Sequence, residues 1–295
     1  MRGPNIVRSP TPLNPPEFTK DDIHFNKWLA GFIDGDGCFY LSTHETINGN
    51  RDAALSIAQA LWNNNILLLL KEKLGGNIYK ARGNTNAYCL KKREHLIPLV
   101  HKVNGHIRAT SRTVQFKALC ELVNITYIRP IPLMANDPYL SGFFDADGSF
   151  YVTSNGQKVK SSVTMEVTSK YQEDLEVFRK AYNGDIRFYR TASCYKWTIG
   201  RRTDILFANK CLLGNLKSNK QIRNNLVPLF YDLRDKQAYK IDSHYNGDWN
   251  NLIERWYDNG ADIYRKDCKG VPYTEKARLA RKMEKSLNHD NNDET

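Results

Sequence analysis

The chain has 295 residues, 41% of them hydrophobic, and its 43 basic and 32 acidic side chains give a formal net charge of +11. Its apolar runs are far shorter than the roughly 18 residues that a membrane span needs, and its six cysteines form no Cys-x-x-Cys pair. These features exclude a membrane protein and a zinc module, and they do not favour secretion. Residues 236–295 hold 11 basic and 11 acidic side chains, so the whole basic excess lies in residues 1–235. A basic body favours a polyanionic partner, above all nucleic acid.

Residues 1–24 are expected to form an extended arm, because five prolines between positions 4 and 16 oppose helix and strand. The first helix is predicted over residues 24–36 and contains the sequence Leu29-Ala-Gly-Phe-Ile-Asp-Gly-Asp-Gly37. Gly31 and Gly35 are four residues apart, so they share a helix face that a second helix can approach closely. Gly37 is predicted to end this helix in a left-handed conformation.

Two hairpins and three further helices are predicted before residue 125. The strands are expected at residues 38–42, 53–59, 77–82 and 88–92. The helices are expected at residues 62–74, 94–104 and 113–124. The proline-containing segment 128–138 is interpreted as a linker.

The same order of elements returns after the linker. A helix over residues 139–147 contains Leu140-Ser-Gly-Phe-Phe-Asp-Ala-Asp-Gly148, and Gly148 is again predicted to be left-handed. The elements that follow are strands at 149–154, 161–169, 185–190 and 195–200, a helix at 172–181, and two helices ending near residue 234. The predicted fold class is therefore α+β, with two pseudo-symmetric αββαββα repeats over residues 25–127 and 139–235. Each repeat should carry one four-stranded antiparallel sheet.

Both motifs end in Asp-x-Asp-Gly, which places Asp36 and Asp147 at the C-termini of two packed helices. Negative charge is unfavourable at a helix C-terminus, and two neighbouring carboxylates repel each other. One such motif is compatible with a solvated helix cap, whereas two matching motifs favour a divalent cation between the carboxylates. Asp34 and Asp145 lie on a different helix face and are expected to be structural.

The doubled motif resembles the paired signature of LAGLIDADG homing endonucleases in their single-chain form, over roughly residues 25–235. The resemblance implies cleavage of a long double-stranded DNA site by a monomer with an internal pseudo-dimer. It implies Mg²⁺, with Mn²⁺ as a substitute, held by Asp36 and Asp147 and by the backbone carbonyls of Gly35 and Ala146. It also implies an intron-encoded protein of an organelle, with the mitochondrion favoured over the chloroplast, and no membrane partner.

Gln59 is a further catalytic candidate. It shares strand parity with Leu55 and Ile57, so it should point inward, where the resemblance implies an amide that orients the attacking water. The alternative is an ordinary polar group at a strand end. Ser169 occupies the matching place in the second repeat, which makes the two half-sites unequal.

A basic residue near each centre is also implied by the resemblance. The candidates are Lys217 and Lys220 in the second repeat, and Arg108 and Arg112 in the first. The register is open, and a solvated basic turn is the alternative.

Strand alternation places Val163, Met165 and Val167 on one sheet face and polar residues on the other. Such a polar face fits a DNA major groove, although it can also be simply solvated. The DNA-binding candidates are Lys80, Arg82, Lys158, Lys160, Thr164, Glu166, Thr168, Lys170, Arg187, Arg190, Lys196 and Arg202.

The first repeat's second strand presents only Ala54, Ser56, Ala58 and Ala60 on its outward face. This composition leaves a second class open, namely an RNA-binding intron maturase or a catalytically silent nucleic-acid-binding subunit. Residues 236–295 are predicted to form a helical, charge-neutral extension, with helices at 248–257 and 274–287 and disorder from residue 289.

Overall fold

The structure, a computed structural model, describes residues 16–45, 51–153 and 161–257. Residues 1–15 of the arm expected over residues 1–24 lie outside these ranges. The helix expected at 274–287, the disorder expected from residue 289 and the candidates Lys158 and Lys160 lie outside them too. None of the described helices combines the length and the hydrophobicity of a membrane-spanning segment.

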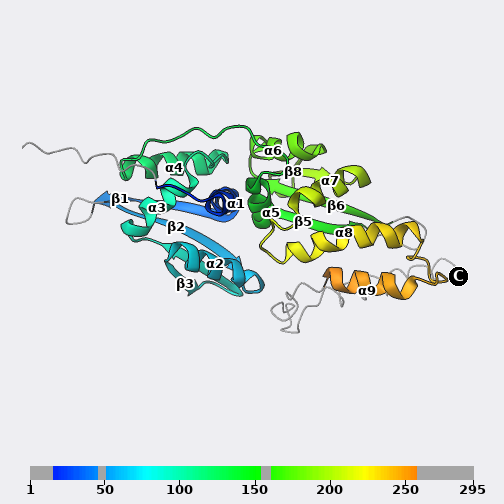
Figure 1. Cartoon of the computed structure of the whole chain (residues 1–295). Helices are drawn as coiled ribbons and strands as arrows, with labels where there is room; N and C mark the ends of the chain where they lie inside the picture. Colours follow the sequence, from blue (N-terminus) through cyan, green and yellow to red (C-terminus); the bar gives the residue numbers. More distant parts are fainter. Residues whose placement is uncertain (1–15, 46–50, 154–160, 258–295) are drawn as a thin grey trace, which may run out of the picture.

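Two copies of one α+β arrangement follow each other along the chain, which confirms the predicted fold class (Figure 1). The first copy consists of α1 (Lys20–Asp36), β1 (Gly37–Glu45), β2 (Arg51–Ala60), the 3-10 helix η1 (Leu61–Asn63), α2 (Asn64–Leu74), β3 (Asn77–Lys80), β4 (Thr85–Leu90), α3 (Arg93–Val103) and α4 (Thr110–Leu122). The second copy consists of α5 (Pro138–Asp147), β5 (Gly148–Thr153), β6 (Ser162–Ser169), α6 (Gln172–Tyr182), β7 (Asp185–Tyr189), β8 (Cys194–Ile199), α7 (Arg202–Leu212) and α8 (Lys220–Asp235).

A further helix, α9 (Asn246–Tyr257), belongs to the expected C-terminal extension and lies beside α8 (Figure 1). Its Trp249, Leu252 and Trp256 are buried. The Trp249 and Trp256 rings lie 5.3 and 6.2 Å from the ring of Phe230 in α8. This part of the extension is therefore packed onto the second repeat.

Both sheets are antiparallel and have the same strand order, β1-β2-β4-β3 and β5-β6-β8-β7. The first strand of each sheet begins with the glycine that follows the motif helix. Gly37 pairs with Ile57 in the first sheet, and Gly148 pairs with Val167 in the second. Gln59 and Ser169, each two residues further on, therefore occupy equivalent positions in the two repeats. One face of each sheet is covered by apolar side chains under the helices, and the other face is open.

The first helix begins at Lys20 instead of the predicted residue 24, so the prediction of an extended arm is wrong for residues 20–24. Thr19 and Asp22 form a capping box, in which each side chain accepts a hydrogen bond from the other residue's backbone N–H. The prolines that argued against a helix all precede this cap, where they do no harm.

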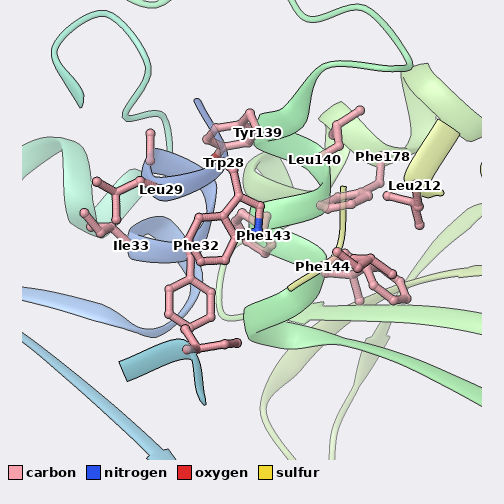
Figure 2. Close-up of a cluster of buried hydrophobic side chains, with 14 of the residues drawn as sticks. Trp28, Leu29, Phe32, Ile33, Tyr139, Leu140, Phe143, Phe144, Phe178 and Leu212 are labelled. Carbon is pink, nitrogen blue, oxygen red and sulfur yellow. The ribbon is translucent and has the colours of Figure 1, made fainter. Parts of the chain in front are cut away.

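Helices α1 and α5 pack side by side at the centre of the molecule (Figure 1). A Cβ added to Gly31 would lie 2.0 Å from the Tyr139 carbonyl oxygen, and one added to Gly142 would lie 1.8 Å from the Trp28 carbonyl oxygen. The two backbones therefore touch at these glycines, as the four-residue spacing predicted. Figure 2 shows Trp28 and Phe32 of α1 facing Phe143 of α5 in the buried core around this contact.

The prediction of left-handed glycines at the ends of these helices is wrong. Gly37 and Gly148 have φ values of −79° and −81°, which are extended conformations. A lack of space requires glycine instead, because a Cβ would lie 2.7 Å from the Ile33 carbonyl oxygen at Gly37 and 2.4 Å from the Phe144 ring at Gly148. Each helix therefore passes directly into its first strand, and its last aspartate lies at that junction.

Candidate active site

Asp36 and Asp147 lie together at the C-terminal ends of α1 and α5. A Cβ added to Gly35 would lie 3.4 Å from the Asp147 Oδ2 atom, so the backbone of α1 runs beside the opposite carboxylate. Burial, followed by the charge of Asp36, raises the pKa of Asp147 to about 6. Burial also raises the pKa of Asp36. Two charged carboxylates are therefore disfavoured here unless a cation compensates them.

Two basic side chains reach the ends of the same helices. The Lys220 Nζ atom donates to the carbonyl oxygens of Phe144, Asp145 and Ala146 at 3.0, 2.7 and 2.9 Å. In the first repeat, Arg112 donates through Nε to the Ile33 carbonyl oxygen at 3.3 Å. Both cations oppose the rise in the carboxylate pKa values, and both compensate the negative helix ends.

The other two basic candidates lie in the interface between the repeats. The Lys217 Nζ atom lies 5.4 Å from the centre of the Trp28 ring, and the Arg108 guanidinium lies 5.0 Å from that of Tyr139. The structure therefore places the Lys217 ammonium over an aromatic ring, whereas Lys220 donates to the carbonyls at the end of α5. Lys220 is left as the basic candidate of the second repeat.

Asp34 and Asp145 connect each helix to the opposite repeat. Tyr139 donates its hydroxyl to Asp34 at 2.6 Å, and the Trp28 indole N–H donates to Asp145 at 2.8 Å. Backbone N–H groups of Ala109 (3.0 Å) and Lys217 (2.7 Å) also donate to Asp34 and Asp145, respectively. These two buried acids are structural, as predicted. The roles of Tyr139 and Trp28 as hydrogen-bond donors were not predicted. The signal for them is that each aromatic residue directly precedes the leucine that begins its motif.

Replacing Tyr139 by phenylalanine is expected to lower the free energy of unfolding by about 1–3 kcal/mol, because it removes a donor to a buried carboxylate. The measurement is denaturant unfolding of the two proteins. Tyr40→Phe is the matched control, since this side chain is 59% exposed, and surface changes usually stay within about 0.5 kcal/mol. Equal stability of Tyr139→Phe and the parent protein would contradict the structural role of Asp34.

Gln59 points inward, as predicted, and only 7% of it is exposed. Its Nε2 atom donates to the Asp36 carboxylate. Its Oε1 atom accepts a long hydrogen bond of 3.4 Å from Asn63. The amide therefore holds the Asp36 carboxylate of the first repeat in place.

Ser169 makes no equivalent contact in the second repeat. Its hydroxyl donates to the Asp174 Oδ2 atom at 2.9 Å. The other oxygen of Asp174 accepts from the backbone N–H and the hydroxyl of Thr110 at 2.8 and 2.7 Å, across the repeat interface. Within the described part of the chain, no side chain replaces Gln59 as a partner of Asp147. The two halves of the site are unequal, and the bridging role of Asp174 was not predicted.

Sequence and structure comparisons agree with this geometry. The LAGLIDADG endonuclease family matches residues 29–123 and 140–231, which cover both repeats. The chain belongs to this family.

Two curated relatives and one solved structure illustrate the match. The chain is 36% identical over 252 residues to the intron-encoded RNA maturase bI4 of Saccharomyces cerevisiae, covering 82% of this chain and 38% of the relative. It is 31% identical over 252 residues to the probable intron-encoded endonuclease aI2 of Debaryomyces hansenii, covering 79% of this chain and 37% of that relative. The chain thus spans less than two-fifths of the length of each relative.

The fold is similar to that of I-SmaMI bound to an uncleaved DNA target in the presence of calcium ions. The TM-score is 0.57 at 17% identity, and the match covers 81% of this chain and 99% of that one.

The junction of the two LAGLIDADG helices fits a hard divalent cation. Its donors are carboxylate oxygens whose charged form is disfavoured by burial, and hard oxygen donors suit Mg²⁺ or Mn²⁺. The Ala146 carbonyl already accepts from Lys220, but a carbonyl has a second lone pair. The described residues contain no group of three or more His, Cys, Asp or Glu side chains that could hold a metal. Backbone carbonyls and water would complete the shell, which is usual for Mg²⁺ and unusual for zinc.

The open face of the second sheet carries several of the DNA-binding candidates. Lys196 forms an ion pair of 2.7 Å with Glu166, and Arg187 lies next to Lys196 on the neighbouring strand. The Arg187 side chain is 77% exposed and lies 3.7 Å from Asp185. Thr168, Lys170 and Arg190 are also accessible beside this face.

Three candidates are less suited to contact DNA through a sheet face. Only 9% of Thr164 is exposed. Lys80 is exposed, but it shares strand parity with the inward residue Ile78 and so lies on the helix side at the end of edge strand β3. Arg82 is exposed in the loop that follows this strand. Arg202 begins α7 and forms an ion pair of 2.8 Å with Asp235 at the end of α8. Arg202 therefore joins two helices and does not lie on the sheet face.

Proposed function

We propose that this protein is a site-specific endonuclease that hydrolyses both strands of a long DNA target in intron homing. The observation that carries the proposal is the pairing of Asp36 with Asp147 at the helix junction, with Lys220 and Arg112 on the same helix ends. Both acids come from one chain, so a monomer with an internal pseudo-dimer suffices. The intron-encoded relatives support an organellar location, for which we favour the mitochondrion.

Asp36 and Asp147 would hold Mg²⁺, or Mn²⁺ in its place, together with the carbonyls of Gly35 and Ala146. A bound divalent cation polarises the scissile phosphate, activates water and neutralises the leaving oxygen. Gln59 fixes the Asp36 carboxylate by its hydrogen bond and offers an amide beside it to orient water. Lys220 and Arg112 supply fixed positive charge where negative charge develops on the phosphate.

The test uses a supercoiled plasmid that carries the uninterrupted junction of the exons flanking the intron. Incubation with Mg²⁺ or Mn²⁺ should linearise this plasmid, and a plasmid with the intron inserted at the junction should stay intact. Ca²⁺ should support binding without cleavage, and excess chelator should stop the reaction. Full cleavage in chelator, or cleavage of both plasmids alike, would contradict the proposal.

The two DNA strands should be cut at unequal rates, because Gln59 contacts Asp36 whereas Ser169 bonds Asp174. A nicked plasmid should accumulate before the linear product. Gln59→Ala should lower the cleavage rate of one strand by about 100-fold, which is typical of groups that assist proton transfer. The cleavage rate of the other strand should stay nearly unchanged. Strand-specific end labels measure both rates. Equal slowing of both strands would contradict the assignment of Gln59 to one centre.

A second candidate function is binding of intron RNA in splicing. The 36% identity to a relative named as an RNA maturase favours it, and so do the outward positions Ala54, Ser56, Ala58 and Ala60 of β2, which carry no charge. An RNA-binding protein of this kind would recognise shape and 2′-hydroxyl groups, not the edges of a B-form major groove.

A further inference from the structure

Near the helix junction, the open face of the first sheet is neutral where that of the second is charged. In the first sheet, Ala58 pairs with Ala87, and Ala87 pairs with Tyr79. Ala58 and Tyr79 are exposed and Ala87 is half-buried. Outward positions within residues 37–42, 53–60, 77–80 and 85–90 carry no charged side chain. The charged residue with outward parity in β2, Asp52, lies at the start of the strand, far from the junction.

The equivalent row of the second sheet has different chemistry. There Thr168 pairs with Lys196, and Lys196 pairs with Arg187. Ala58 and Thr168 each follow the residue that pairs with the helix-ending glycine, Ile57 and Val167, so both rows lie equally far from the catalytic junction. Two methyl groups and a phenol in one half thus correspond to a hydroxyl and two cations in the other.

The major groove offers one apolar group, the 5-methyl of thymine, and alanine side chains are suitable partners for it. Arginine and lysine instead match the O6 and N7 acceptors of guanine. We propose that the first sheet reads its half-site through thymine methyl groups, which pack against Ala58 and Ala87. The inference rests on the proposed function, because it requires the open sheet faces to lie in a duplex major groove.

The test starts from duplexes selected from a random library by the full chain in Ca²⁺, where binding is measured without cleavage. The variant Arg187→Ala identifies which half-site lies under the second sheet, because its preference for guanine should relax only in that half-site. Thymine is then replaced by deoxyuracil, which removes the methyl group alone. Each replacement in the inner part of the other half-site should weaken binding about fourfold, the value for about 0.8 kcal/mol per buried carbon. Replacements opposite Lys196 and Arg187 under the second sheet should have no effect.

Two protein variants make the assignment specific to residues. In Ala58→Gly, deoxyuracil and thymine should bind equally at the contacted position, whatever the overall affinity of the variant. Ala87→Lys introduces the side chain found at the equivalent Lys196 position and should shift the selected base toward guanine. Tight selected binding with no loss on thymine replacement, or with equal losses in both halves, would overturn this inference alone. Failure to select any duplex would overturn the proposed function first.

Discussion

Replacing Asp36 or Asp147 by asparagine is expected to lower the rate of DNA cleavage by at least about 1,000-fold. Asparagine keeps the shape of the side chain but removes the charge that would hold a divalent cation. Such a cation contributes several kcal/mol to the transition state of phosphate hydrolysis, and each 1.36 kcal/mol is a factor of ten in rate. DNA affinity should stay equal or rise, because one negative charge near the phosphates is lost.

Single-turnover cleavage and duplex binding in Ca²⁺ measure the two effects separately. Asp232→Asn is the matched control, since this acid lies on α8 in an exposed pair with Lys236 and should leave both quantities unchanged. Retention of a tenth or more of the parent rate by either active-site variant would show that its carboxylate is not needed.

Replacing Gly31 or Gly142 by alanine should lower the free energy of unfolding by about 3 kcal/mol or more. The added Cβ would lie 2.0 or 1.8 Å from a backbone oxygen of the opposite helix. Backbone cannot swing aside as a flexible side chain can, so the helices would have to separate, and overpacking of this kind typically costs about 1–3 kcal/mol and occasionally more. The melting temperature should fall by roughly 6 °C or more.

Thermal unfolding with and without denaturant measures this loss. Gly200→Ala is the matched control, because the nearest atom to its added Cβ is the Thr164 hydroxyl at 4.0 Å. Parent-like stability of both Gly31→Ala and Gly142→Ala would show that α1 and α5 do not meet backbone to backbone.

Much of the fold was predictable because its signals are local. Small residues at a four-residue step and strand alternation each act over a few positions. The doubling of the motif then predicts the second repeat once the first is known. The start of α1 was predicted too late because it depends on a capping pair, Thr19 and Asp22, and the prolines just before this pair argue against a helix. Gly37 was misread because a glycine can serve a positive φ or a lack of space, and the sequence does not distinguish them.

The site was predictable only where a motif or strand parity determines it, as for the two acids and Gln59. Lys217 and Lys220 are three residues apart, and only the position of the α8 N-terminus decides which one reaches the end of α5. Asp174 joins Thr110 across the interface between the repeats, a contact that no local pattern encodes. Arg202 was chosen for its charge alone, and its helix partner becomes visible only in three dimensions.

The most direct test of the proposed function is a competition binding experiment with the full chain. The uninterrupted exon-junction duplex and the intron RNA compete for the protein in Ca²⁺, and the mixture is then transferred to Mg²⁺. We expect the duplex to displace the RNA, the affinity of the duplex to fall steeply with salt as many phosphates are neutralised, and Mg²⁺ then to yield a double-strand cut. Displacement of the duplex by the RNA, with no cut DNA in Mg²⁺ or Mn²⁺, would contradict it.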